Sequence, residues 1–133
     1  MTFAPVRSFA FLSSNLKFLN SSTLVSSENK LNFGDGADNL YSAKLKNGDS
    51  IDMGAGDDTV SLMLTGSNGT PTISAANLSK LDGGAGSDTL SFEESGAFTG
   101  ELNLTLAGAT NFENIIGTTG AETIKGDNNS NIL

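Results

Sequence analysis

The chain has 133 residues, enough for one domain, and contains no cysteine and no histidine. These absences exclude disulfides, thiol or imidazole catalysis and the ordinary ligand sets of zinc. The net charge of −8 comes from 15 acidic and 7 basic residues. It argues against nucleic acid and anionic membranes as partners, because both need a basic surface. No apolar run approaches the roughly 18 residues that span a bilayer, so we expect no membrane insertion.

The first part of the chain is rich in Ser, Asn, Phe and Leu and shows no repeat. We expect residues 1–23 to form an irregular N-terminal segment or cap, and residues 24–133 to form one repeat domain. Apolar residues make up only 37% of the chain and tryptophan is absent, so the material for a compact core is sparse. Stacked repeats need less, because each repeat buries only a few inward side chains.

Three segments share a glycine-rich turn that ends in aspartate, with one large aliphatic residue two positions later. We call 33–38, 53–58 and 83–88 the glycine turns. Another aliphatic residue lies nine positions before each of these, which gives the pairs Leu31 and Leu40, Ile51 and Val60, and Leu81 and Leu90. Degenerate copies of the turn follow at 117–122 and 126–131, and we call these the C-terminal turns.

The nine-residue spacing accommodates a tight turn of about six residues and a strand of about three. Two such units make one flattened coil with a strand on each side, so the sequence predicts an all-β solenoid. The glycine turns start 20 and 30 residues apart, one coil plus an insertion, and should stack on one edge. The opposite edge should hold the loop insertions 42–48, 62–78 and 92–111. The alternating residues 101–106 should add a strand there.

Residues 33–41, 53–61 and 83–91 resemble the RTX family, the hemolysin-type calcium-binding repeats of bacterial proteins exported by type I secretion. Residues 112–118 and 126–133 are similar to the looser repeats of the same proteins. The resemblance implies a right-handed parallel β-roll with Ca²⁺ in its stacked turns, folding after export, and a secreted, extracellular bacterial protein. The insertions break the strict repeat, so an irregular right-handed parallel β-helix is a second form of the same prediction.

The resemblance also implies which residues hold the ion. The last residue of each glycine turn would contribute its side chain: Asp38, Asp58 and Asp88. Backbone carbonyls would come from Gly34, Gly36, Gly54, Gly56, Gly83, Gly84 and Gly86. The sequence departs from the repeat at several places: Phe33 and Met53 replace the first glycine, Glu122 and Asn131 the aspartate. We therefore expect the C-terminal turns to be poor calcium sites, with at most a weak third site at Glu122.

Elementary chemistry agrees with this interpretation. Glycine permits the left-handed conformations that turn carbonyls to one side, and calcium takes six to eight oxygens at about 2.3–2.6 Å. Stacked strands lie about 4.8 Å apart, so one ion fits between two adjacent turns, and three turns predict two sites. Without metal, each neighbouring carboxylate pair costs on the order of 3 kcal/mol at an effective dielectric near 20. We therefore expect calcium to be needed for folding.

Other sites built from glycines or paired acids fit less well. No lysine follows the glycine turns as a P-loop requires, and no EF-hand loop ends in glutamate at the right distance. A polysaccharide lyase needs a cation near its base, yet the one arginine is Arg7, outside the repeats. We expect no enzyme activity. Seven further acids should face water, although the four aspartates among them could be outer ligands of the ion: Asp35, Asp52, Asp57, Asp82, Glu93, Glu94 and Glu101.

The sequence thus predicts a calcium-dependent structural module of a secreted bacterial protein. Its partners would be calcium ions and further domains of a larger parent chain, because the sequence stops at Leu133 within an expected strand, without the polar cap of a solenoid. Two alternatives stay open: the accessory repeat region of an extracellular hydrolase, and a segment of an RTX adhesin. A catalytic domain upstream in the parent gene would favour the first. Binding to a glycan or a surface without turnover would favour the second.

Overall fold

The computed structural model of the chain describes residues 8–11, 19–20, 29–42, 48–65, 72–73, 80–94, 100–103 and 109–133. Every regular element in these residues is a β-strand. The strands are β1 Ser8–Phe11, β2 Leu19–Asn20, β3 Asn29–Asn32, β4 Asn39–Ser42, β5 Ser50–Asp52, β6 Thr59–Thr65, β7 Thr72–Ile73, β8 Lys80–Asp82, β9 Thr89–Glu94, β10 Glu101–Asn103, β11 Ala109–Thr110, β12 Asn114–Ile116 and β13 Thr123–Lys125. Within the same residues, no helix is long and apolar enough to cross a membrane.

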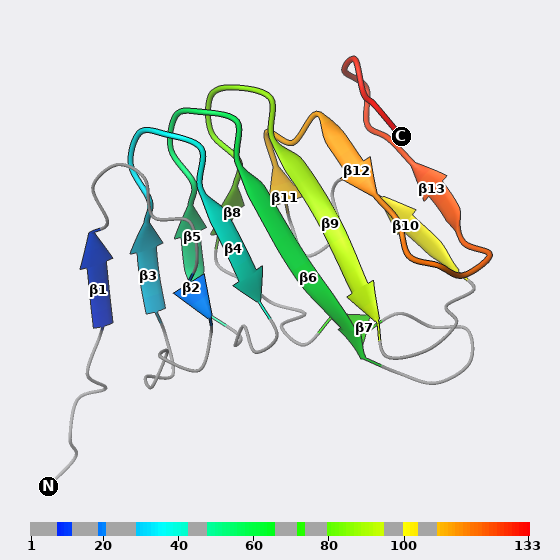
Figure 1. Cartoon of the computed structure of the whole chain (residues 1–133), viewed down its shortest axis with the longest axis horizontal. Helices are drawn as coiled ribbons and strands as arrows, with labels where there is room; N and C mark the ends of the chain where they lie inside the picture. Colours follow the sequence, from blue (N-terminus) through cyan, green and yellow to red (C-terminus); the bar gives the residue numbers. More distant parts are fainter. Residues whose placement is uncertain are drawn as a thin grey trace, which may run out of the picture.

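Most of these strands belong to two parallel sheets that face each other (Figure 1). The first sheet has the order β1-β3-β5-β8-β11, and the second has the order β12-β9-β6-β4-β2. Along the chain, consecutive strands of these two orders alternate between the sheets. A strand therefore pairs in parallel with the strand one round earlier, 20 to 30 residues away for β3, β5 and β8 and for β4, β6 and β9. The predicted all-β class with parallel sheets is confirmed for the described residues.

The register of both sheets aligns the aliphatic residues that the nine-residue spacing singled out. In the first sheet Leu31 pairs with Ile51 and Ile51 with Leu81. In the second sheet Leu40 pairs with Val60, Val60 with Leu90 and Leu90 with Ile115. All of these side chains are buried in one cluster between the sheets. Parallel in-register pairing thus turns one aliphatic residue per strand into two continuous apolar rows.

Larger side chains fill the space between these rows. Phe33 and Met53, at the first position of their turns, are fully buried. At the same position Gly83 has no positive φ, whereas the second and fourth glycines of the turns do. In the first two glycine turns, the first position therefore faces the core and does not require glycine. The two apparent departures from the repeat supply the core with bulk that a glycine would not.

Two parts of the N-terminal segment, residues 8–11 and 19–20, are described, and both are strands. Within residues 1–23, strand β1 extends the first sheet by pairing with β3, and β2 extends the second by pairing with β4. Parallel pairing needs only regularly spaced backbone N–H and C=O groups, so a strand can join the sheets without carrying the repeat motif. The boundary at residue 23 is therefore not a boundary of the sheets.

The predicted loop insertions lie mostly outside the described residues. Their described parts show that β6 and β9 continue past their inward aliphatic positions to Thr65 and Glu94, and that β7 pairs antiparallel with β6. The strand expected at 101–106 is present over 101–103 as β10. It pairs with β13 in a separate two-stranded sheet. The chain after β12 thus leaves the two main sheets at β13, and Ile132 returns to bridge Asn114 of β12 in parallel.

Candidate metal centre

The three glycine turns lie side by side along one edge, at the top of Figure 1, where they connect β3 to β4, β5 to β6 and β8 to β9. Parallel bridges join Asp35 to Ala55 and Ala55 to Ala85 across the turns. The Gly36 N–H donates to the Ala55 carbonyl at 2.7 Å. The structure therefore brings together the three turns that the spacing predicted to be neighbours.

Glycine is required where one turn packs on the next. A Cβ on Gly54 would lie 1.8 Å from the Gly34 carbonyl oxygen, and a Cβ on Gly84 would lie 1.9 Å from the Gly54 oxygen. The backbone also adopts positive φ at Gly34, Gly36, Gly54, Gly56, Gly84 and Gly86. Any other residue would both strain the backbone and separate the turns.

Two of the predicted carbonyl ligands already accept hydrogen bonds from the next turn. The Ala55 N–H donates to the Gly34 oxygen at 3.0 Å, and the Ala85 N–H donates to the Gly54 oxygen at 2.8 Å. Each carbonyl oxygen has a second lone pair, which leaves capacity for a cation. These carbonyls point along the row of turns, which is the direction that a shared site between turns needs.

The three predicted aspartates form a row inside the turns. Asp38, Asp58 and Asp88 are 0%, 1% and 0% exposed. They point inward because each lies two positions before an inward aliphatic residue, and side chains two apart share a strand face. The Asp38 N–H donates to Asp58 Oδ1 at 2.8 Å, and the Asp58 N–H donates to Asp88 Oδ1 at 2.8 Å. Each carboxylate therefore reaches back to the preceding turn.

The second carboxylate oxygen of Asp58 and of Asp88 is buried and accepts no hydrogen bond from the described residues. Burial, together with the negative charges of Asp88, Asp38 and Asp57, raises the pKa of Asp58 to about 6. Burial likewise raises the pKa of Asp88, with Glu113 adding to the effect. A buried, unsatisfied anionic oxygen is costly, so this row is a site where a cation would be strongly stabilising.

A fourth carboxylate, which the glycine pattern did not indicate, continues the row. The Asp88 N–H donates to Glu113 Oε2 at 2.9 Å, the same bond that links the three aspartates. Glu113 lies two positions before the buried Ile115, and the buried Asp49 lies two positions before Ile51. The sequence signal that could have identified both residues is an acidic residue two positions before an inward-facing aliphatic residue.

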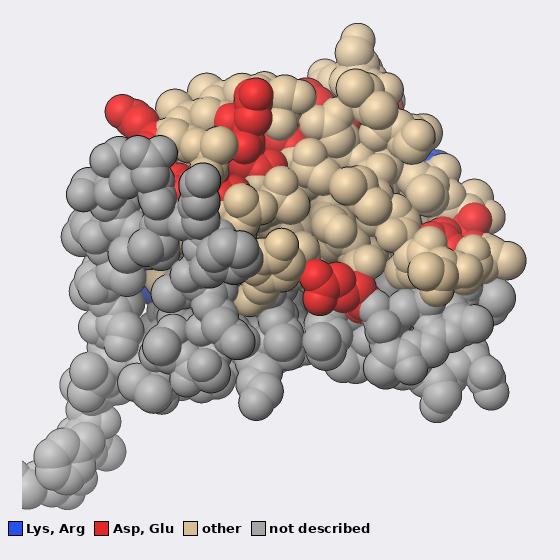
Figure 2. Space-filling model, in the orientation of Figure 1, with Lys and Arg blue, Asp and Glu red and all other residues tan. Residues whose placement is uncertain are grey.

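The outer surface of the turns is also acidic. Asp35 and Asp57 are exposed, and Figure 2 shows acidic atoms along the upper edge, where Figure 1 places the glycine turns. Asp57 is more than a solvated side chain, because its Oδ1 accepts the Ser87 N–H of the next turn at 3.0 Å. The edge therefore carries buried and exposed negative charge together.

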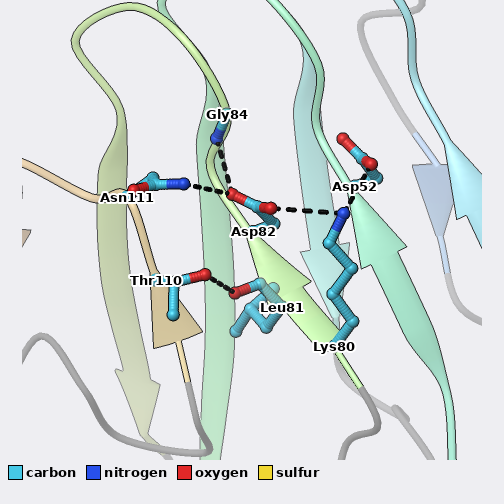
Figure 3. Close-up of polar contacts among 7 residues, drawn as sticks. All are labelled: Asp52, Lys80, Leu81, Asp82, Gly84, Thr110 and Asn111. Atoms are coloured by element: carbon cyan, nitrogen blue, oxygen red, sulfur yellow. Dashed lines mark hydrogen bonds and ion pairs between the residues drawn. The ribbon is translucent and has the colours of Figure 1, made fainter.

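Two other stacked acids, at the ends of β5 and β8, have a cation supplied by the protein (Figure 3). Lys80 Nζ lies 2.7 Å from Asp52 Oδ2 and 3.2 Å from Asp82 Oδ2. The Asp52 carboxylate raises the pKa of Lys80. Asp82 Oδ1 also accepts from Asn111 Nδ2 at 2.8 Å and from the Gly84 N–H at 3.1 Å. These two acids, expected to face water only, belong to a polar network.

The C-terminal turns hold their acidic or amide residue differently. Glu122 Oε1 accepts the Thr118 N–H of its own turn, and Asn131 Oδ1 accepts the Asp127 N–H at 2.9 Å. Burial acts to raise the pKa of Glu122, but the hydrogen bonds that it accepts within its own turn, above all from the Thr118 N–H, lower it below its ordinary value. The turn 117–122 follows β12 of the second sheet, whereas every glycine turn follows a strand of the first sheet. The expected weak third site beside the glycine turns is therefore not formed by Glu122.

The donors along the glycine turns are carboxylate and carbonyl oxygens only, a set that suits a hard cation such as calcium. Among the described residues, no three acidic side chains converge as a metal-binding group. Each space between glycine turns instead has two carboxylates and the glycine carbonyls beside them. No protein-family model, curated protein or solved structure matches the chain.

Proposed function

We propose that the chain is a calcium-binding, calcium-dependent folding module of a secreted bacterial protein of the RTX type. In this proposal the two parallel sheets are the sides of a right-handed β-roll or β-helix. The observation that supports it most directly is the buried row of carboxylates along glycine turns, in which Asp58 Oδ2 and Asp88 Oδ2 have no hydrogen-bond partner among the described residues.

Two ions would bind between successive glycine turns. Asp38 and Asp58 would hold one, and Asp58 and Asp88 the other, each with carbonyls from the glycines of the two turns. Bound calcium supplies positive charge that neutralises the carboxylates. The chain supplies the close approach of the turns through its glycines and the orientation of each carboxylate through the N–H of the preceding turn.

This arrangement couples binding to folding. The carboxylates become neighbours only when strands 20 or 30 residues apart in sequence are paired. In the metal-free folded state, each neighbouring pair of ionised carboxylates costs on the order of 3 kcal/mol. Binding that occurs only in the folded state adds its free energy to folding. The calcium concentration outside a cell would therefore select the folded chain after export.

The proposal includes no catalysis by this chain. The acids of the row are at most 1% exposed in the three glycine turns, so a substrate cannot reach them. Their role is to join successive turns and so to stabilise whatever further domains the parent chain carries. A hydrolase domain or a binding domain elsewhere in the parent protein is compatible with this role.

The test is a calcium titration followed by far-ultraviolet circular dichroism, with magnesium as the control cation. We expect a transition to β-structure at roughly 0.1–1 mM calcium and none with magnesium, since extracellular modules bind in or near that range. Asp58→Asn should weaken the response by about tenfold or more. The matched variant Glu122→Gln also converts an acid to an amide, and it should leave the response unchanged. A β signal insensitive to chelation and to both variants would refute the proposal.

A further inference from the structure

The connection from β11 to β12 also joins the first sheet to the second, and it is much shorter than the three glycine turns. Only residues 111–113 link β11 to β12. β11 pairs with β8 and β12 with β9, so this short connection lies directly beside the third glycine turn (Figure 1). The Gly83 N–H donates to the Thr110 oxygen at 3.0 Å, and the Glu113 N–H donates to the Asp88 oxygen at 3.1 Å. The short connection therefore replaces a fourth glycine turn in the row.

Oxygen atoms from both connections converge at Gly83. The point that a Cβ would occupy on Gly83 lies 2.0 Å from the Asn111 carbonyl oxygen and 3.0 Å from Asp88 Oδ2. The Asn111 oxygen and Asp88 Oδ2 are therefore at most about 5 Å apart, close enough to share one calcium ion whose bonds are about 2.3–2.6 Å long. The Asp88 oxygen is buried and unpartnered among the described residues. The first position of the other two glycine turns carries the buried side chains of Phe33 and Met53 instead.

The surrounding residues fix this geometry. Asn111 has a φ of 55°, a left-handed conformation, and its side-chain amide donates to Asp82 Oδ1 at 2.8 Å (Figure 3). Asp82 is in turn held by Lys80 and by the Gly84 N–H. Glu113 brings a further carboxylate to within a hydrogen bond of the Asp88 N–H. These hydrogen bonds thus hold the Asn111 carbonyl, Asp88 and Glu113 close to one another.

We propose that Asp88, the carbonyl of Asn111 and the carboxylate of Glu113 form a third calcium site, which ends the row. Asp88 has two carboxylate oxygens, so Oδ2 would face this site, while Oδ1, which accepts the Asp58 N–H, keeps a second lone pair for the ion between the second and third turns. This inference rests on the proposed function, because it assigns a further ion to the same edge. The row of turns ends at this point because the next turn along the chain, 117–122, follows a strand of the second sheet.

The experiment counts bound calcium ions on the whole chain by native mass spectrometry. Circular dichroism in excess calcium confirms that each variant is folded. The wild-type chain should bind three ions and Glu113→Gln two, because the amide keeps the hydrogen-bond acceptor and removes the charge. Gly83→Ala keeps every carboxylate and has no positive φ to strain, but its methyl group would lie 2.0 Å from the Asn111 oxygen and displace that carbonyl, so it should also bind two. The control Glu122→Gln should retain three.

Each outcome is decisive. A wild-type count of two, or a full count retained by Glu113→Gln or by Gly83→Ala, overturns the third site and leaves the proposed function intact. A wild-type chain that binds no calcium at all overturns the proposed function itself. The two failures are therefore distinguished by the wild-type count alone.

Discussion

The glycine turns and the C-terminal turns follow the same sequence pattern but stabilise their last residue in opposite ways. In the glycine turns, the carboxylate of one turn accepts an N–H from the preceding turn, at 2.8 Å for Asp58 and for Asp88. In the C-terminal turns, Glu122 and Asn131 accept an N–H of their own turn. The first arrangement links turns to each other, and the second closes each turn by itself.

The electrostatic consequences also differ in sign. Burial raises the pKa of Asp58 and of Asp88, since their burial and mutual repulsion outweigh the hydrogen bonds that they accept. Backbone hydrogen bonds outweigh burial at Glu122 and lower its pKa. The hydrogen bonds within its own turn thus favour the charged form of Glu122, whereas burial disfavours the charged forms of Asp58 and Asp88. The comparison teaches that the motif alone does not predict a metal site. A candidate site also needs a neighbouring turn of the same kind packed beside it.

The largest effect should come from replacing the fourth residue of a glycine turn with alanine. The same replacement in a C-terminal turn is the comparison. In Gly56→Ala the residue has a φ of +141° and its Cβ would lie 2.1 Å from the Gly36 oxygen. We expect backbone strain of about 1–3 kcal/mol, plus the cost of separating the turns, and loss of the calcium-induced transition in circular dichroism. Gly120→Ala is the control, because Gly120 is not among the glycines with positive φ in the described residues. Equal effects of the two substitutions would remove the distinction between the turns.

The second prediction concerns pH. The pKa of Asp58 is raised to about 6 in the folded metal-free chain, above the ordinary value of 3.8, so its contribution to stability is greatest below the ordinary value and is lost as pH rises through 6. We expect the calcium-depleted chain to gain β-structure on acidification from pH 7 to 5. The gain in folding free energy is about 1 kcal/mol per pH unit below 6. The stabilisation that added calcium provides should shrink by the same amount.

The C-terminal turns should behave differently over this pH range. Because the pKa of Glu122 is lowered, its contribution is present above the ordinary value of 4.5 and is lost only as pH falls through the lower folded value. Circular dichroism of calcium-depleted Asp58→Asn and Glu122→Gln at pH 5 and 7 separates the two regions. The pH response should shrink in the first variant, in which the raised pKa of Asp88 remains, and persist in full in the second. A wild-type β signal that falls on acidification to pH 5 would contradict the assignment.

The smallest effect should come from Lys80, which provides a third way of accommodating stacked acids. Lys80→Gln removes the positive charge between Asp52 and Asp82, both of them partly exposed to solvent. Exposed ion pairs contribute about 0–1 kcal/mol, so we expect urea unfolding in excess calcium to shift by less than that amount. Lys125→Gln, which removes a longer, exposed pair with Glu101 at 3.7 Å, is the control. A loss of several kcal/mol for Lys80→Gln alone would show that the network with Asn111 is essential to the fold.

Much of the fold could be predicted from the sequence, because its signals are local. The nine-residue spacing indicated the inward aliphatic residues, and the register confirms their alignment in two parallel sheets. The glycine positions indicated the turns that pack together. The N-terminal strands β1 and β2 carried no such signal, since backbone pairing alone places them in the sheets. Phe33 and Met53 seemed to depart from the repeat until their side chains were placed in the core.

The sequence by itself determined which residue types recur at each turn, because a strand of fixed period places an aspartate and an aliphatic residue two positions later on the same inward face. Only the tertiary structure decided which turns are neighbours. Glu113 lies beside Asp88, 25 residues away, and Lys80 beside Asp52, 28 residues away, because parallel pairing joins strands across connections of unequal length. The same pairing directs the chain after β12 to β10, so Glu122 closes its own turn. Strand pairing determines which turns lie next to each other, and no local sequence pattern encodes that pairing.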